Sequence, residues 1–187
     1  MFSRTYVRRL EGDAGEKARS TSRLLLACAL VLYVLGAGPA GAMDPARLAV
    51  FDFELIDSSL QGEGQSPDPA DVARLRMVEA ELRERRAASG RFELVDITPA
   101  AAQLEGGRQL WNCSGCEVAI ARRLDADLAL LGWVQKVSNL ILNLNITIRE
   151  VESRELTFAG SVDIRGNIDE SWRRGIHYLL DNRLLKE

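Results

Sequence analysis

The amino-acid sequence predicts an α/β (α+β) domain, a mixed sheet of about five strands with helices packed mainly on one face. Strand-like runs at 46–56 and 91–97 are separated by a helical pattern at 71–89, which predicts a parallel pair with a right-handed crossover. Three further strand-like runs follow closely between 127 and 165, which predicts an antiparallel meander. An amphipathic pattern at 169–185 completes the order β-α-β-α-β-β-β-α.

Residues 1–42 are predicted to be a cleaved secretory signal peptide rather than part of the fold. A polar, basic stretch precedes the apolar run 24–35, which is too short to span a bilayer and typical of a signal. Ala40 and Ala42 then supply the pattern that signal peptidase accepts. The mature chain is therefore expected to span 43–187; an uncleaved anchor or lipidation at Cys28 is the alternative.

Charge and length restrict what the mature chain can do. Without its signal the chain carries 18 Lys and Arg against 24 Asp and Glu, a net charge of −6. This balance argues against binding to nucleic acid or anionic lipid, because both favour a basic patch. A chain of this size buries one core, so we expect a single domain.

The first half of the domain is expected to begin with one buried strand over 46–56. Its apolar residues divide between two faces, Leu48, Val50 and Ile56 against Ala49, Phe51, Phe53 and Leu55. The acidic, turn-rich stretch 57–69 is expected to be a mobile surface loop. Asp71 then opens a helix that Gly90 ends.

The second half follows from local start signals and from periodicity. Thr98 and Pro99 are a good N-cap and first helical residue, which predicts a short helix. The remaining expected elements are a strand at 91–97, helices at 98–104 and 115–124, strands at 127–137, 140–151 and 156–165, and a helix at 169–185.

The last two strands alternate polar and apolar residues. One face carries polar side chains: Asn143, Asn145, Thr147 and Arg149, with Thr157, Ser161, Asp163 and Arg165. The polar side chains of the two strands lie on the same face only if the residue numbers of each cross-strand pair add to an even number, near 306 or 308. The face is then either a plain solvated surface or a hydrogen-bonding platform for a partner, with Asn143 and Asn145 as candidate interface residues.

Two cysteines remain after signal removal, Cys113 and Cys116. Haem attachment is excluded because Glu117 stands where a His is required, and the residues before the pair are not a convincing strand for a thioredoxin-like site. A zinc site needs four ligands, and the chain offers two thiols and one His. In an oxidising compartment we expect a structural disulfide, with a redox-active or metal-binding pair as the alternatives.

Other polar residues have mainly structural interpretations. Asp52, Glu54 and Asp57 lie close in sequence, and paired carboxylates can serve acid–base chemistry or hold a cation. A polar patch at a strand end is the favoured interpretation. His177 lies beside the apolar stripe of the last helix and is expected to flank it rather than act as a base or ligand. We predict no catalytic residues, metal ligands or cofactor.

The junction 164–174 between the last strand and the last helix is the preferred interface candidate. Trp and Arg are enriched at binding hot spots, which makes candidates of the following residues: Arg165, Asn167, Trp172, Arg173 and Arg174. The alternative is that Trp172 is wholly core, because it shares a helical stripe with Ile176 and Leu180. Burial of Trp172 decides between them.

Several runs resemble the amino-terminal domain of TolB and the periplasmic domain of CsgG. They are LAVFDFEL (48–55), SGRFELVD (89–96), DADLALLGWV (125–134) and ITIREVESRELTFAG (146–160). The resemblance covers most of the mature chain and implies a non-catalytic TolB-N-terminal-like domain that binds other proteins in the periplasm.

A second resemblance rests on GWVQKVSNLILNLN (132–145) and IRGNIDESWRRGI (164–176). These runs resemble an uncharacterised family of short exported proteobacterial proteins, which implies a link to periplasmic quinoprotein alcohol oxidation. We predict a periplasmic accessory or adaptor domain of a Gram-negative bacterium, bound to a periplasmic or outer-membrane-associated protein. The alternative is a thiol-redox or metal-handling accessory of a quinoprotein dehydrogenase system that uses Cys113 and Cys116.

Overall fold

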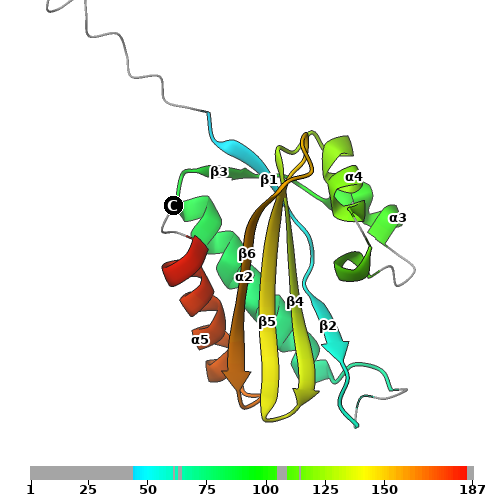
Figure 1. Cartoon of the computed structure of the whole chain (residues 1–187), viewed down its shortest axis with the longest axis vertical. Coiled ribbons are helices and arrows are strands. Elements are labelled where there is room, and N and C mark those ends of the chain that lie inside the picture. Colours follow the sequence, from blue (N-terminus) through cyan, green and yellow to red (C-terminus); the bar gives the residue numbers. More distant parts are fainter. Residues whose placement is uncertain (1–43, 61, 63–64, 105–108, 114, 185–187) are drawn as a thin grey trace, which may run out of the picture. The chain divides into compact units, whose positions relative to one another are not determined.

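The computed structural model describes residues 44–60, 62, 65–104, 109–113 and 115–184, so the predicted signal peptide lies outside it. Pro45–Glu187 forms one compact unit. Its six-stranded mixed sheet has the strand order β3-β1-β4-β5-β6, and β2 pairs with β4 beyond the end of β1 (Figure 1). The predicted fold class is confirmed. Within the described residues, no helix is both long enough and apolar enough to cross a membrane.

The elements follow the predicted order with small shifts at their ends. The strands are β1 (Ala46–Val50), β2 (Glu54–Asp57), β3 (Phe92–Leu94), β4 (Leu128–Ser138), β5 (Ile141–Glu150) and β6 (Leu156–Arg165). The helices are α2 (Pro69–Ala88), α3 (Ala101–Leu104), α4 (Cys116–Arg123) and α5 (Asp169–Leu179). Short 3-10 turns are η1 (Thr98–Ala100) and η2 (Leu110–Asn112), and η3 (Leu180–Leu184) continues α5 as a π-helical turn.

The strand expected over 46–56 is broken in two. Val50 pairs with Leu130 and Glu54 pairs with Trp133, so three residues, 51–53, lie opposite two on β4. The extra residue shifts the register by one, as in a β-bulge, and a shift of one sends the following side chains to the other face.

Because of the bulge, the apolar residues of 46–56 divide between the two faces of the sheet differently from the prediction. Phe53 and Leu55 join the same core as Leu48, not the face of Phe51 as the alternation predicted. The ring of Phe53 lies where a Cβ on Gly132 would stand, so glycine is required there for the ring to cross β4.

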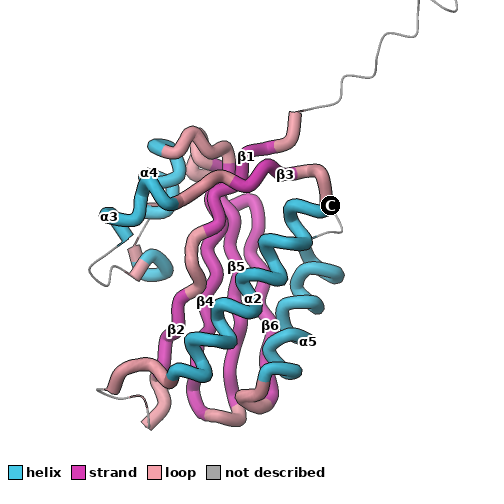
Figure 2. The backbone as a smooth tube through the Cα atoms, turned by 180° about the vertical axis from the view of Figure 1, so that it is seen from behind, coloured by secondary structure: helices cyan, strands magenta, loops and turns pink. Residues whose placement is uncertain are grey.

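The two long helices, α2 and α5, cover one face of the sheet (Figure 2). The apolar stripe of α2 is buried there, as predicted, at Leu75, Val78 and Leu82. The stripe of α5 and η3 meets the same core through Trp172, Ile176, Leu179, Leu180 and Leu184. This is the larger of two apolar layers.

A second, smaller layer lies on the opposite face, where α3, α4 and the 3-10 turns pack. Its core joins Ala49 and Phe51 of the early chain to Val118 and Ala121 of α4, and to Leu131 of β4. The prediction that helices lie mainly on one face therefore holds for the long helices, while the short ones lie on the other. They cover only part of the sheet, so much of β4, β5 and β6 is unshielded by helices on this side (Figure 1).

The meander has the predicted register. Pairs between β5 and β6 have residue numbers that add to 306 from Ile141–Arg165 to Ile148–Phe158, and a shift follows at Arg149. The alternate residues Leu142, Leu144, Ile146 and Ile148 are buried in the larger core. The polar sets of the two strands therefore share the unshielded face.

Candidate functional site

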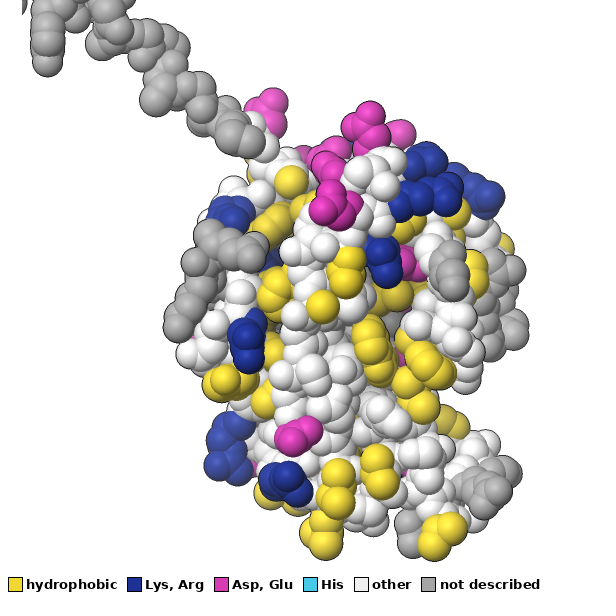
Figure 3. Space-filling view, viewed as in Figure 1, with side chains coloured by type: hydrophobic (Ala, Val, Ile, Leu, Met, Phe, Trp, Pro, Cys, Tyr) yellow, Lys and Arg dark blue, Asp and Glu magenta, His cyan; other side chains and the backbone are white. Residues whose placement is uncertain are grey.

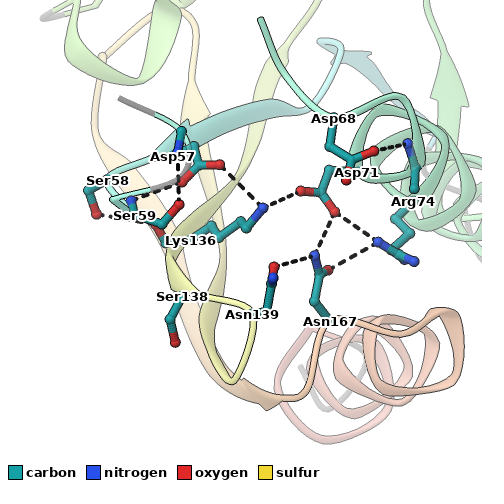
Figure 4. Close-up of polar contacts among 12 residues, drawn as sticks. Asp57, Ser58, Ser59, Asp68, Asp71, Arg74, Lys136, Ser138, Asn139 and Asn167 are labelled. Carbon is teal, nitrogen blue, oxygen red and sulfur yellow. Dashed lines mark hydrogen bonds and ion pairs between the residues drawn. The ribbon is translucent and has the colours of Figure 1, made fainter. Parts of the chain in front are cut away.

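A buried ion cluster lies at the end of the sheet where β2 and β4 finish. Lys136 occupies a core-facing position of β4, in line with Leu130 and Val134, and is only 5% exposed. Its Nζ lies 2.6 Å from Oδ2 of Asp71 and 3.3 Å from Oδ2 of Asp57 (Figure 4). Two carboxylates from different elements therefore neutralise one buried ammonium group.

Asp71, in the first turn of α2, connects this pair to the last helix. Its Oδ1 accepts hydrogen bonds from Nη1 of Arg74 at 2.8 Å and from Nδ2 of Asn167 at 2.7 Å (Figure 4). Arg74 also donates from Nε to Asp169 at 2.9 Å. The ion cluster, defined as Asp57, Asp71, Arg74, Lys136 and Asn167, thus links β2, α2, β4 and the junction before α5.

The protonation of the cluster follows from these contacts. Burial alone would raise the pKa of Asp71, but hydrogen bonds from Lys136 and Asn167 and the charge of Lys136 lower it below 3.8 overall. The pKa of Asp57 is lowered likewise, because hydrogen bonds from Ser59 and Lys136 outweigh its burial. Burial would lower the pKa of Lys136, and its two carboxylate partners raise it above 10.5. All three groups are therefore charged at neutral pH.

Backbone hydrogen bonds fasten three segments around this cluster. The N–H of Ser58 donates to the carbonyl of Lys136 at 2.9 Å, which fixes the start of the loop expected to be mobile. The N–H of Asn167 donates to the carbonyl of Asn139 at 2.9 Å, and that of Gly166 to Leu140 at 3.3 Å. The loop after β2, the β4–β5 hairpin and the β6–α5 junction are thus tied together.

Large apolar side chains project from these three segments into solvent. They are Leu60 (88% exposed), Val137 (50%), Leu140 (72%), Ile141 (48%) and Ile168 (56%), here called the apolar rim. Figure 3 shows hydrophobic side chains gathered at this lower end of the molecule, around the β4–β5 hairpin and the loop after β2. A grouping of this kind is typical of a binding surface.

The ion cluster differs from the rim in how accessible its polar groups are. The ammonium group of Lys136 is held between two carboxylates and is nearly inaccessible, so it offers no free nucleophile or base. The described residues contain no group of three or more His, Cys, Asp and Glu side chains able to hold a metal ion. The apolar rim, in contrast, exposes its side chains to solvent on segments that backbone hydrogen bonds join to one another.

The structure corrects the prediction for Trp172. This side chain is fully buried, and its Nε1 donates to Oδ1 of Asn167 at 2.9 Å. The prediction that Trp172 anchors an interface is therefore wrong. The physical reason is the helical stripe that it shares with Ile176 and Leu180, both of which are also buried.

The other junction candidates have different surroundings. Asn167 is occupied by the ion cluster and by Trp172. Arg173 donates from Nε to Glu81 at 2.9 Å, while the Arg174 side chain is 70% exposed and 3.6 Å from Glu170. The side chain of Arg165 is 74% exposed, with Nη2 3.8 Å from Asp163. Arg165 and Arg174 are therefore the accessible charges of the junction.

The amides of the unshielded face bond mainly to their neighbours. Asn143 donates from Nδ2 to Asp163 at 3.0 Å and accepts from Oγ of Ser161 at 2.9 Å. Asn145 donates from Nδ2 to the carbonyl of Asn143 at 3.2 Å. These contacts fit a solvated sheet face, so Asn143 and Asn145 offer a partner less than the apolar rim does.

The cysteine pair lies away from the ion cluster, between η2 and α4. The Cα atoms of Cys113 and Cys116 are 5.5 Å apart and the sulfurs are joined, an arrangement that suits a short structural staple. Gly115, between them, has φ of +86°, which glycine adopts without strain. His177 pairs with Glu81 on the helical face.

The three early acidic residues do not form one site. Asp52 is exposed, with Oδ1 3.7 Å from Arg83. Glu54 accepts from the N–H of Leu110 at 2.7 Å and so orders η2, while Asp57 belongs to the ion cluster. The bulge at 51–53 places Asp52 and Glu54 in different settings.

Sequence reasoning missed Lys136 and the apolar rim. Lys136 alternates with the core-facing residues Leu130 and Val134 of its strand, and this position is a signal for a buried charge. Leu140 stands in a two-residue hairpin turn, where polar residues are usual, and Ile168 precedes a helix at the cap position. Apolar residues at such positions are an available signal for a contact surface.

Comparison with protein-family models identifies a family that matches this chain. The model of the family DUF3280, described as "Protein of unknown function (DUF2380)", matches residues 46–184. Among curated proteins the chain has no match.

Several solved structures are similar in part. The LpoB C-terminal domain from Salmonella enterica is 18% identical, with a TM-score of 0.47 over 67% of this chain and 87% of that one. Lipoprotein GNA1162 from Neisseria meningitidis is 13% identical, with a TM-score of 0.47 over 75% and 99%. TolB from Acinetobacter baumannii is 11% identical, with a TM-score of 0.40 over 73% and 28%.

Proposed function

We propose that this chain, which belongs to the family DUF3280, is a non-catalytic accessory domain that binds another protein through its apolar rim. The observation that carries the proposal is the grouping of five exposed large hydrophobic side chains at one end of the sheet. Full burial of a single such side chain is worth about 1.5–3 kcal/mol, so a partner that covers several of them gains appreciable affinity.

The ion cluster supports this role because it fixes the base from which the rim projects. Leu60, Leu140 and Ile168 come from three segments far apart in sequence. Hydrogen bonds from Ser58 to β4 and from Asn167 to the hairpin hold those segments in one arrangement. A surface that is ordered before binding loses less conformational entropy on binding, which favours affinity.

The nature of the partner follows from the shape and charge of the surface. Small-molecule sites are concave and enclosing, whereas the rim residues are about half or more exposed. A net charge of −6 on residues 43–187 disfavours anionic membranes. A protein with an apolar patch of its own fits these conditions best.

A periplasmic location is part of the proposal. The apolar run 24–35 with Ala40 and Ala42 favours export, and the paired Cys113 and Cys116 suit an oxidising compartment. A partner in the periplasm or at the outer membrane follows from that location.

The test is quantitative capture of partners from periplasmic extract by purified protein. Leu140→Asp places a charge in the rim at an exposed position, and we expect it to lower capture by at least tenfold (about 1.4 kcal/mol). Ala119→Asp, an exposed position of α4 at the other end of the domain, is the matched control and should retain capture. Equal capture by both variants would contradict the proposal.

A further inference from the structure

Two tryptophans lie outside both apolar cores. Trp133 alternates with the core-facing residues of β4, so its half-buried side chain lies on the unshielded face of the sheet. Trp111, in η2, is 36% exposed. Neither ring belongs to the larger or the smaller core of the described residues. Aromatic side chains outside a core are enriched at binding sites, because they combine a large apolar ring with a polar group.

Glu54 connects the two tryptophans. It is the cross-strand partner of Trp133 on β2, so the two side chains lie next to each other on the same face. Its carboxylate accepts from the N–H of Leu110 at 2.7 Å and from that of Trp111 at 3.3 Å. Figure 3 shows a hollow in this part of the molecule, between the central strands and the layer of short helices, with hydrophobic side chains along it. Both tryptophans therefore lie on segments that border the hollow.

Uncharged hydrogen-bonding side chains surround Trp133 on the sheet. Asn145 lies opposite Trp133 on β5, and Ser161 lies opposite Asn145 on β6. Asn145 donates from Nδ2 to the carbonyl of Asn143, while its Oδ1 accepts from no described residue. Gln135, two residues along β4, is exposed and its side chain bonds to no described residue. A ligand that covers the Trp133 ring therefore meets both donors and acceptors.

The charged groups around the hollow already have partners within the chain. Two backbone N–H groups of η2 satisfy the carboxylate of Glu54. Nε of Arg149 lies 3.2 Å from Oε1 of Glu117, where α4 meets the face. Oδ2 of Asp163 lies 3.8 Å from Nη2 of Arg165 on the outer strand. A face whose charges are paired in this way favours a neutral ligand over an acidic or a basic one.

We propose that this hollow, which is separate from the apolar rim, binds a neutral glycan chain with one pyranose ring stacked on Trp133. The C–H groups on the flat side of a pyranose are apolar and electron-poor, and the face of an indole is electron-rich. Sugar hydroxyls both donate and accept, which matches the amides and the hydroxyl beside Trp133.

A proline-rich peptide is the other neutral ligand that binds to aromatic surfaces. Its prolines accept hydrogen bonds but have no N–H to donate, so it leaves the amide oxygens of this face without a partner. The mixture of donors and acceptors therefore favours the glycan. An extended, β-linked chain fits the open sheet face better than a coiled, α-linked chain, because its flat rings lie in a row.

Isothermal titration calorimetry of the purified protein tests the site. The probes are cellohexaose and chitohexaose, which are β-linked, and maltohexaose, which is the α-linked counterpart of cellohexaose. At least one β-linked chain should bind, and maltohexaose should bind about tenfold more weakly or not at all. If neither β-linked chain binds at millimolar concentration, or if maltohexaose binds as well as they do, the proposal is overturned.

Variants separate the hollow from folding and from the rim. Trp133→Ala removes the ring from outside both cores, so the circular dichroism spectrum should be retained while sugar affinity falls by about tenfold or more. Gln135→Ala, at an exposed position, should lower the affinity by about threefold through the loss of one hydrogen bond. Leu140→Asp, in the rim, should leave sugar binding unchanged even where it abolishes partner capture.

Two results would contradict the assignment of the ligand and of its position. Sugar binding that is unchanged in Trp133→Ala would place the ligand elsewhere on the protein. A proline-rich peptide that binds more tightly than either β-linked chain, and that is lost in Trp133→Ala, would show that the hollow is a peptide site.

Discussion

The two ends of β4 differ in the apolar surface that they expose. Near its start, Val151 and Ala126 are buried beside α4, and Arg122 reaches over them to donate to the carbonyl of Val151 at 2.6 Å. Near its other end, Lys136 is buried and Leu140 is exposed. The first end also buries a charge, that of Glu117, whose Oε1 lies 3.2 Å from Nε of Arg149. The second end differs because exposed apolar side chains surround its buried charge.

The contrast indicates what each end is for. Burial of charge is costly and exposed apolar area gains nothing in the isolated domain, so stability alone does not favour the second arrangement. A partner that covers the apolar rim changes this balance, because the exposed area then contributes to affinity. The ion cluster holds the rim in place, whereas the α4 end closes the smaller core.

The largest expected effect is on removal of the buried ammonium group. Lys136→Met keeps the length of the side chain but leaves Asp57 and Asp71 facing an apolar group, and should lower the free energy of unfolding by about 3 kcal/mol. Arg122→Met, at the other end, removes a partly exposed hydrogen bond and should cost about 1 kcal/mol. Urea denaturation measures both values. Equal losses would remove the distinction between the two ends.

The same cluster predicts how stability changes with pH. The pKa values of Asp57 and Asp71 are lowered in the folded state, so their contribution is present above pH 3.8 and is lost as the pH falls through the folded values. The pKa of Lys136 is raised, so its contribution is present below pH 10.5 and is lost as the pH rises further.

The midpoint temperature of thermal unfolding should therefore fall at both acid and alkaline pH. Asp71→Asn removes one of the titrating carboxylates, so the midpoint temperature of this variant should fall less at acid pH. If the midpoint temperature of Asp71→Asn falls at acid pH as much as that of the wild type, other carboxylates determine the acid dependence.

A smaller effect is expected at the cysteine pair. Changing both Cys113 and Cys116 to Ser opens only a short loop, which costs about 1–2 kcal/mol. Because the pair lies near α4, partner capture through the rim should be unchanged. Loss of capture with retained folding would point instead to a role of the cysteines in binding.

The sequence could predict the meander because each strand buries one face. Alternation from Leu142 to Ile148 identified the core side, and parity then restricted the register to even sums. β1 and β2 could not be predicted in the same way, because apolar residues lie on both faces of the run 46–56 and the alternation is uninformative there. The bulge depends on the fit of Phe53 over Gly132, 79 residues further along the chain.

The candidate site was harder to predict than the fold. Lys136 and Asp71 are 65 residues apart and meet only through the packing of α2 on the sheet. Trp172 shows the opposite difficulty, since its residue type favours an interface while its helical position favours the core. In the structure Trp172 is buried, as its helical position predicts. The junction itself lies at the rim, but through Ile168 rather than Trp172.

The most direct test of the apolar rim is photocrosslinking in intact cells. A photoreactive phenylalanine analogue at Leu140 or Ile168 should form a covalent adduct with the same partner protein. The analogue at Ala119, which is also exposed on α4, should not form that adduct. The absence of an adduct at both rim positions, or the same adduct at all three, would contradict it.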